Sequence, residues 1–194
     1  RHCDWWFTDD AVLLDTAGRY TTQESDREAD AGAWLGFLKL LKQSRPRQPI
    51  NGVLLTVSAV DLLQQSAAER EAHADAVRAR LQELHEQFQT RFPIYVLVTK
   101  SDLLAGFDLF FAALGKEERA QVWGMTFARQ ADASALPQAA FGAEFDALQS
   151  RLIDRVLDRM QAERDPAQRA LAHAFPQQFG NLKAPLGSFL ERVF

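Results

Sequence analysis

The chain has 194 residues, 47% of them hydrophobic and 25% charged, which suffices for one globular domain with a sizeable core or one domain with an appendage. A net charge of −4, with acidic and basic residues interspersed, argues against nucleic acid as a partner. The single cysteine, Cys3, excludes an intrachain disulfide, and no apolar run reaches the roughly 18 residues of a membrane helix. The opening RHCDWWFTDD, without a Met, indicates a fragment of a longer protein.

The first predicted elements are two antiparallel strands. The runs CDWWFT (3–8) and AVLLD (11–15) flank Asp9 and Asp10, a polar pair that suits a short hairpin turn. Because the second run is continuously apolar, we expect a strand that is covered on both faces. Apolar residues at helical spacing then predict a helix over residues 31–43.

Strands and helices alternate along the middle of the chain. The apolar runs predict strands at 52–58 and 94–102, with a short last strand at 125–128. Helices are predicted at 66–89, with Ser66 as its cap, and at 108–124. Such alternation is typical of a mostly parallel sheet wrapped by helices, here with the antiparallel hairpin at one edge.

The last part of the chain is helical in pattern. A long amphipathic helix is predicted from Phe141 to Met160. A tail from Pro166 to Phe194 continues an apolar helical stripe, which we expect to break at Pro176 and Pro185. We therefore predict one α/β domain over residues 1–165 and the start of a helical extension over residues 166–194.

The stretch DTAG follows the second predicted strand and suggests half of a nucleotide site. Asp15 can hold Mg²⁺ directly or through water, and the backbone N–H of Gly18 can approach a terminal phosphate because no Cβ blocks it. Thr16 lies between them and Arg19 follows. A plain turn at a strand end is the alternative, in which Arg19 pairs with nearby acidic side chains instead of stabilising phosphate charge as a catalytic residue.

The stretch TKSD (99–102) ends the predicted strand at 94–102 and suggests the other half. In GTPase-like proteins a strand ends in Asn or Thr, then Lys, any residue and Asp, and Thr99, Lys100 and Asp102 fit this looser form. The carboxylate can accept hydrogen bonds from the guanine edge while the Lys stem packs along the base. The alternative makes Asp102 a cap and Lys100 a solvated side chain.

The two motifs occur in the order that a P-loop NTPase requires, but a phosphate loop is missing. No GxxxxGKS or GxxxxGKT sequence occurs in the chain, and that loop supplies the backbone cradle, the phosphate lysine and the Mg²⁺ hydroxyl. The predicted fold is therefore a GTPase-like, three-layer P-loop NTPase fold that lacks its P-loop part. We expect the chain alone to be inactive and to hold no cofactor.

The motif set closely resembles the cytoplasmic domain of the IcmF/TssM family, the large inner-membrane component of the bacterial type VI secretion system. The resemblance covers essentially the whole chain and rests on the runs CDWWFTDDAVLLDTAGRYTTQ, AWLGFLKLLK, PINGVLLTVSAVDLLQQS, FPIYVLVTKSDLLAGF, QVWGMTF and FPQQF. It implies a larger multi-pass membrane protein, with a P-loop before residue 1, GTP or ATP with Mg²⁺ as candidate cofactors, and this domain at the cytoplasmic face of the inner membrane.

The resemblance also implies partners. These are a TssL-like inner-membrane subunit and baseplate proteins on the cytoplasmic side, and a TssJ-like lipoprotein that meets the periplasmic part, within an oligomeric complex. Three hypotheses follow for this domain. It is a docking and assembly module, which we favour, or an NTPase that drives assembly or substrate loading, or part of a free cytosolic GTPase.

Overall fold

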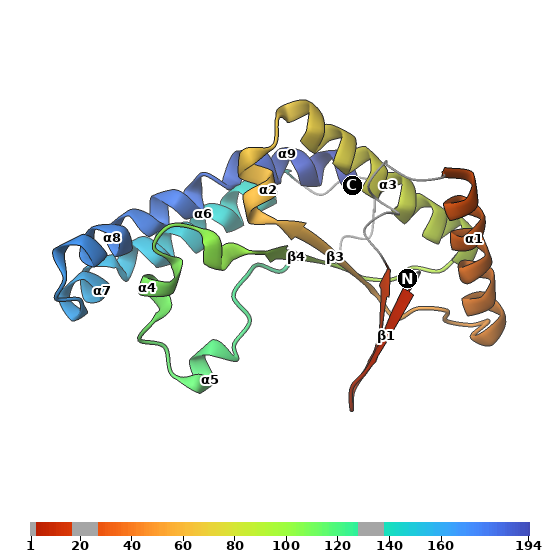
Figure 1. The fold of residues 1–194 in the computed structure, drawn as a ribbon, viewed down its shortest axis with the longest axis horizontal. Helices are drawn as coiled ribbons and strands as arrows, with labels where there is room; N and C mark the ends of the chain where they lie inside the picture. The colour runs from red at the N-terminus through yellow and green to blue at the C-terminus, as the bar shows by residue number, and fades with distance from the viewer. Residues whose placement is uncertain (1–2, 17–26, 128–137) are drawn as a thin grey trace. The chain divides into compact units, whose positions relative to one another are not determined.

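The computed structural model describes three stretches of the chain, residues 3–16, 27–127 and 138–194. They contain the strands β1 (Cys3–Phe7), β2 (Val12–Thr16), β3 (Val53–Ser58) and β4 (Ile94–Thr99) (Figure 1). The helices in them are α1 (Arg27–Ser44), α2 (Ala59–Gln64), α3 (Ala67–Phe88), the 3-10 turn η2 (Ser101–Leu103), α4 (Phe107–Phe111), α5 (Lys116–Arg119), α6 (Gln138–Asp154), α7 (Val156–Ala162), α8 (Pro166–Gly180) and α9 (Lys183–Val193). None of these helices is long and apolar enough to cross a lipid bilayer.

The chain divides into two compact units. The first consists of residues 1–54 and 71–95, and the second consists of residues 55–70 and 96–194. The first unit therefore holds the β1–β2 hairpin, α1 and most of α3, and the second holds α2 and every described element from η2 onward. The division crosses both β3 and β4.

The predicted hairpin is confirmed. β1 and β2 pair antiparallel with Phe7 opposite Val12, and the turn is closed by the Thr8 N–H, which donates to the Ala11 carbonyl at 2.9 Å. The prediction that the second strand is covered on both faces is wrong for the described residues. Val12 is 51% exposed and Leu13 is 41% exposed, and they project from opposite faces. No described element is packed closely enough on either face to bury them.

The first unit is held by the packing of α1 on α3. Apolar side chains of both helices are buried, and polar contacts link the helices at two levels. The Trp34 indole N–H donates to Glu83 Oε2 at 2.7 Å, and the Lys42 ammonium donates to the Gln87 carbonyl at 2.5 Å. Because Glu83 also accepts from Arg80, the buried indole finds a fixed acceptor.

Helix α3 begins at the predicted cap. The Glu69 N–H donates to the Ser66 hydroxyl at 3.3 Å, while the Ser66 hydroxyl and N–H donate to the Glu69 carboxylate at 2.7 and 2.8 Å. This capping box satisfies N–H groups that the first helical turn leaves open. The hydrogen bonds of this box lower the pKa of Glu69 below its ordinary value of 4.5. The bond from the Ser66 side chain has the larger effect, and the bond from the Ser66 backbone has the smaller one.

β3 and β4 form a parallel pair. The Val53 N–H donates to the Pro93 carbonyl at the start of the strands, and the Thr99 hydroxyl donates to the Val57 carbonyl at their end, so both strands run in the same direction. The crossover between them contains α3, where the sequence predicts the helix 66–89, and also the short helix α2, which the sequence analysis did not predict. Among the described residues the four strands form two separate pairs, not one mixed sheet. The three-layer NTPase-like fold therefore stays a prediction.

The second unit is built around α8. Phe175 is fully buried, and its ring lies 5.0 Å from Phe110 of α4 and 5.7 Å from Phe107, measured between ring centroids. One turn later, Phe179 stacks on Phe145 of α6 at 4.7 Å. α9 completes the unit by packing on α6 and α2. The apolar stripe predicted for the tail is thus buried, except at Leu171 and Phe194, which are more than a third exposed.

Several predicted helix ends are wrong. The segment 108–124 forms two short helices, α4 and α5, and the helix predicted from Phe141 is interrupted at Arg155, where α6 ends and α7 follows. The predicted breaks at Pro176 and Pro185 do not occur, since both prolines lie inside helices and the chain turns at residues 181–182 instead. Residues 125–127 form no strand, and residue 128 lies outside the described residues.

The predicted boundary near Asp165 coincides with the start of α8, where the Asp165 carboxylate accepts from the Ala167 N–H at 3.0 Å. The division between the two units, however, falls elsewhere. Residues 166–194 belong to the same unit as residues 96–165, because α8 and α9 contribute most of its buried aromatic core. In the described structure the tail is part of this unit, not an appendage to it.

The close approach of α4 to α8 leads to a first prediction. Gly106 has φ +87°, and a Cβ at this position would collide with the Leu171 carbonyl and lie 3.1 Å from Phe175 Cβ. We expect Gly106→Ala to lower the free energy of unfolding by about 2 kcal/mol or more. Gly142→Ala in α6 is the matched control, because nothing lies within 4 Å of its added Cβ. Denaturant unfolding of both variants measures the difference, and equal stabilities would contradict the packing described.

Truncation after Asp165 provides a second prediction. Removing α8 and α9 exposes Phe110 and Phe145, which are buried largely by Phe175 and Phe179. We therefore expect the shortened chain to lose the cooperative unfolding of the second unit while the α1–α3 packing of the first unit persists. Limited proteolysis and hydrogen exchange report the two units separately. A truncated chain with unchanged protection of residues 96–165 would show that the tail is dispensable.

Candidate functional site

Polar residues gather where β3 and β4 end. The Ser58 hydroxyl accepts from the Asp61 N–H at 3.1 Å and thereby caps α2, which starts directly after β3. Thr99 ends β4, and its hydroxyl donates to the Val57 carbonyl across the strand pair. Both strands therefore bring side-chain oxygens to the carboxyl edge of the sheet. This is the edge at which open α/β sheets bind their ligands.

The TKSD loop has a defined conformation. Lys100 adopts a left-handed backbone with φ 57°, and the Ser101 hydroxyl donates to the Val98 carbonyl at 3.2 Å. The turn points the Lys100 ammonium toward Asp61, with Nζ 3.9 Å from Oδ1. Asp102 lies in the first turn of η2 and is exposed. The structure thus brings Thr99, Lys100 and Asp102 together with Asp61, all within the second unit.

The DTAG stretch is only partly described. Asp15 and Thr16 end β2 in the first unit, with the Asp15 side chain exposed, whereas Gly18 and Arg19 lie outside the described residues. The register places Asp4 directly opposite Asp15, so the two carboxylates project from the same face of the hairpin. We did not predict a role for Asp4. The pairing of Asp4 with Asp15 could have been predicted from the sequence, because a hairpin centred on residues 9–10 places positions 4 and 15 opposite each other.

The carboxylate pair fits part of a Mg²⁺ site. Mg²⁺ is held by one or two carboxylates together with water and the phosphates of its substrate, and Asp4 and Asp15 offer such oxygens. Nowhere in residues 3–16, 27–127 and 138–194 do three or more His, Cys, Asp or Glu side chains form a group that could hold a metal alone. These carboxylates would therefore act only with phosphate oxygens, and the chain carries no P-loop sequence to position them.

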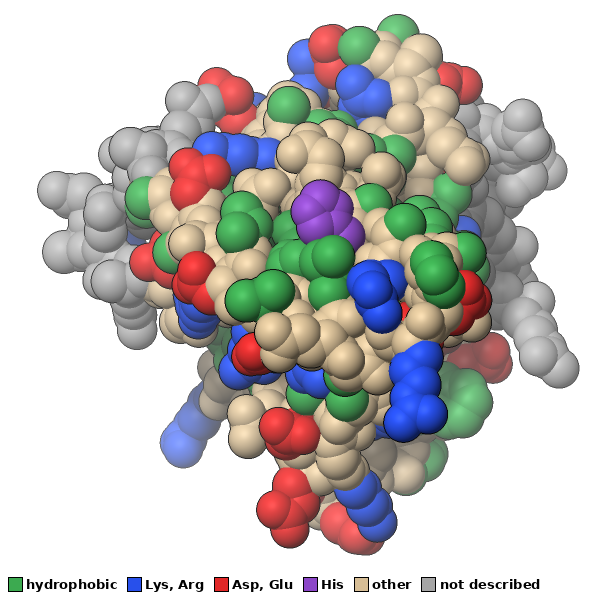
Figure 2. All heavy atoms as spheres, turned by 90° about the vertical axis from the view of Figure 1, so that its left-hand side faces the viewer, with side chains coloured by type: hydrophobic (Ala, Val, Ile, Leu, Met, Phe, Trp, Pro, Cys, Tyr) green, Lys and Arg blue, Asp and Glu red, His purple; other side chains and the backbone are tan. Residues whose placement is uncertain are grey.

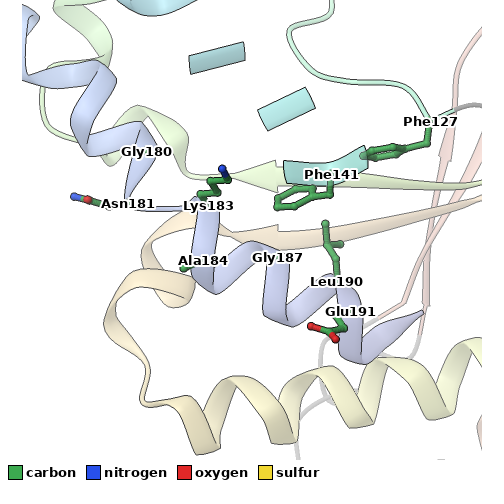
Figure 3. Close-up of a pocket in the computed structure, with 9 residues that line it drawn as sticks. All are labelled: Phe127, Phe141, Gly180, Asn181, Lys183, Ala184, Gly187, Leu190 and Glu191. Atoms are coloured by element: carbon green, nitrogen blue, oxygen red, sulfur yellow. The ribbon is translucent and has the colours of Figure 1, made fainter. Parts of the chain in front are cut away.

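A hollow of about 650 Å³ lies along α9 in the second unit (Figure 3). Gly187 has no side chain, so Phe141 of α6 packs within 3.1 Å of where its Cβ would stand. Figure 3 shows Leu190 of α9 pointing toward Phe141 of α6. The charged side chains Lys183 and Glu191 stand toward the two ends of this hollow. Its lining is mainly apolar and includes none of the residues of the two motifs.

A second hollow, of about 540 Å³, lies between α4 and α5. Three aromatic side chains line it together with charged residues of both helices: Phe107, Phe111 and Trp123. Apolar side chains also reach the surface elsewhere in this unit, since Ile153, Leu157 and Leu171 are each more than a third exposed. The α7–α8 end of this unit faces the viewer in Figure 2, where hydrophobic side chains gather between charged ones.

Comparison with known proteins places these features in a family. The family described as IcmF-related N-terminal domain matches residues 27–194, from the start of α1 to the end of the chain. The chain is also 59% identical over its whole length to the "Type VI secretion system component TssM1" of Pseudomonas aeruginosa. The chain belongs to the IcmF-related family. The resemblance inferred from the sequence motifs is thereby confirmed.

The IcmF-related match begins at residue 27 and so leaves out the hairpin of residues 3–16. The match to the Pseudomonas relative includes the hairpin. This chain spans 18% of the length of that relative. No solved structure matches the chain.

The site geometry leads to a third prediction, on nucleotide binding. Most of the binding energy in P-loop proteins comes from phosphates and Mg²⁺ held by the P-loop backbone, and this IcmF-related chain has no such sequence. We expect calorimetric titration of the chain with GTP or ATP plus Mg²⁺ to show no binding heat. Fluorescent nucleotide analogues provide an independent measurement. A dissociation constant in the micromolar range would contradict the prediction.

Proposed function

We propose that this chain is a docking and assembly module within a type VI secretion component, built on an NTPase-like fold. The observation that carries the proposal is the 59% identity over the entire chain to a protein named as a type VI secretion component. The full protein is proposed to lie in the bacterial inner membrane, with this domain on the cytoplasmic side. A TssL-like subunit, baseplate proteins and a TssJ-like lipoprotein are its proposed partners.

Two side chains of the TKSD loop contact other groups of the chain in the absence of a ligand. The Thr99 hydroxyl already donates to a backbone carbonyl, and Lys100 faces Asp61, so two of three candidate base-binding groups have partners within the chain. The third group, the Asp102 carboxylate, is exposed to solvent. The loop is thus consistent with a domain that has kept the residues of a nucleotide-binding loop without depending on catalysis by them.

The exposed hairpin supports the same proposal. Trp5 and Phe7 stack on one face at 6.3 Å between ring centroids, and Trp6 lies opposite Leu13 on the other face. All four side chains are more than 40% exposed. Apolar surface of this kind is typical of protein–protein contact sites. A hairpin that is apolar on both faces is suited to lie between layers of a larger assembly.

An NTPase is the second candidate function. It is favoured by the juxtaposition of Ser58, Asp61, Thr99 and Lys100 at the carboxyl edge of a parallel strand pair. In the full-length protein, GTP or ATP with Mg²⁺ would be the cofactor, with Asp15 near the metal and Arg19 near the phosphates. The third hypothesis, a free cytosolic GTPase, is not retained, because the family assignment and the relative do not support it.

The two functions predict opposite effects of Asp15→Asn in the full-length protein. This nearly isosteric change removes the charge that would hold Mg²⁺ while leaving the strand pairing in place. Under the docking proposal we expect type VI secretion and co-purification of the other complex subunits to stay within about twofold of wild type. Asp10→Asn in the hairpin turn is the matched control, because it makes the same change outside the motif.

The decisive measurement is a secretion assay in cells where the variant is present at normal level and co-purifies normally. Loss of secretion with Asp15→Asn but not with Asp10→Asn would overturn the docking proposal in favour of the NTPase. Loss of co-purification by both variants would indicate a defect of the hairpin itself. In that case the hairpin, not a metal, would be the functional element.

A further inference from the structure

The hollow between α4 and α5, here called the α4–α5 groove, has an aromatic floor that is fixed from below. Trp123 lies 5.4 Å from Phe111 and 5.0 Å from Phe179, measured between ring centroids. Because Phe179 is itself stacked on Phe145, the indole rests on the buried core of the second unit. Trp123 is nevertheless 41% exposed, so an apolar surface that is packed from below faces solvent.

Two aliphatic side chains near Trp123 add apolar surface. Leu114 lines the groove, and Val122, next to Trp123, is 98% exposed. Exposed aromatic and aliphatic side chains on a pre-ordered surface are typical of the centre of protein–protein contact sites. A large apolar side chain that covers Trp123 would bury surface without requiring the groove to rearrange.

The charged side chains of the groove differ in whether they already make hydrogen bonds within the chain. The Arg119 guanidinium donates to the Ala112 carbonyl at 3.1 Å, and the Glu118 carboxylate accepts from the Gly115 N–H at 2.8 Å. The Asp108 carboxylate, which is exposed at the edge of the groove, has no hydrogen-bond or ionic partner within the described part of the chain. The lining of the groove therefore carries two carboxylates and one guanidinium, and Asp108 is the one of the three without a hydrogen bond inside the described part of the chain.

We propose that the α4–α5 groove binds a protein segment in which a large apolar side chain stands next to a Lys or Arg. The apolar side chain covers Trp123 and Phe111, and the basic group pairs with Asp108. The inference rests on the docking role proposed above and specifies the kind of segment that a docking partner would present to this groove. Negatively charged segments are disfavoured, because the lining carries two carboxylates, Asp108 and Glu118, against the single guanidinium of Arg119.

The test is an NMR titration of the ¹⁵N-labelled chain with two acetylated tetrapeptide amides, Gly-Phe-Arg-Gly and Gly-Phe-Glu-Gly. The indole N–H signal of Trp123, assigned with Trp123→Phe, reports occupation of the floor. We expect a saturable shift with both peptides and about two- to fivefold tighter binding of the Arg peptide, the range for an exposed ion pair. Asp108→Lys should reverse this preference.

Asp158→Lys in α7 is the matched control, because it makes the same charge change on an exposed helix residue outside the groove. It should leave the preference for the Arg peptide unchanged, and the amide spectrum of each variant reports its folding. The inference is overturned if neither peptide gives a saturable shift, if both bind equally well, or if Asp158→Lys removes the preference too. Failure here removes this groove alone, whereas failure of the docking role appears in the secretion assay on Asp15→Asn.

Discussion

The contact of α8 with the aromatic side chains of α4 and α6 is the interaction on which the second unit depends. Phe175 and Phe179 close over Phe110 and Phe145, and each such side chain contributes roughly 1.5–3 kcal/mol when it is buried. The same contact reaches the candidate site. α4 follows the TKSD loop after only a short turn, and Gly106 in that turn lies against the α8 backbone. The packing of the tail therefore determines where the loop at the strand ends is held.

The backbone of the candidate site is thus connected to this packing through Gly106, whereas its charged side chains are exposed. Lys100 and Asp61 are both about half exposed, and an exposed ion pair at 3.9 Å contributes at most about 1 kcal/mol. A ligand could displace this pair at little cost. The preference for docking over catalysis therefore does not rest on the ion pair. It rests instead on the exposed apolar side chains that the β1–β2 hairpin carries on both of its faces.

The sequence predicted what depends on local chemistry and on periodicity. Asp9 and Asp10 marked the hairpin turn, Ser66 marked the start of α3, and the spacing of the tail residues marked the buried face of α8 and α9. Helix ends were missed because an apolar stripe continues across a break such as Arg155. Pro176 predicts a helix break because it has no N–H to donate, yet it is buried within α8, where tertiary packing outweighs the lost hydrogen bond. Burial of the strands was also missed, since it depends on which other segments cover them.

The exposure of these strands has a physical consequence for the proposed function. Leu54, Tyr95 and Leu97 leave one face of the parallel pair apolar and exposed, and parallel strands in stable sheets are covered on both faces. Two-stranded sheets are marginally stable by themselves. Both strand pairs therefore gain stability from whatever covers them, and any segment or partner that does so shifts the equilibrium toward the folded state by its own binding energy. Coupling of this kind between folding and assembly does not depend on nucleotide hydrolysis, and it is compatible with the docking role proposed above.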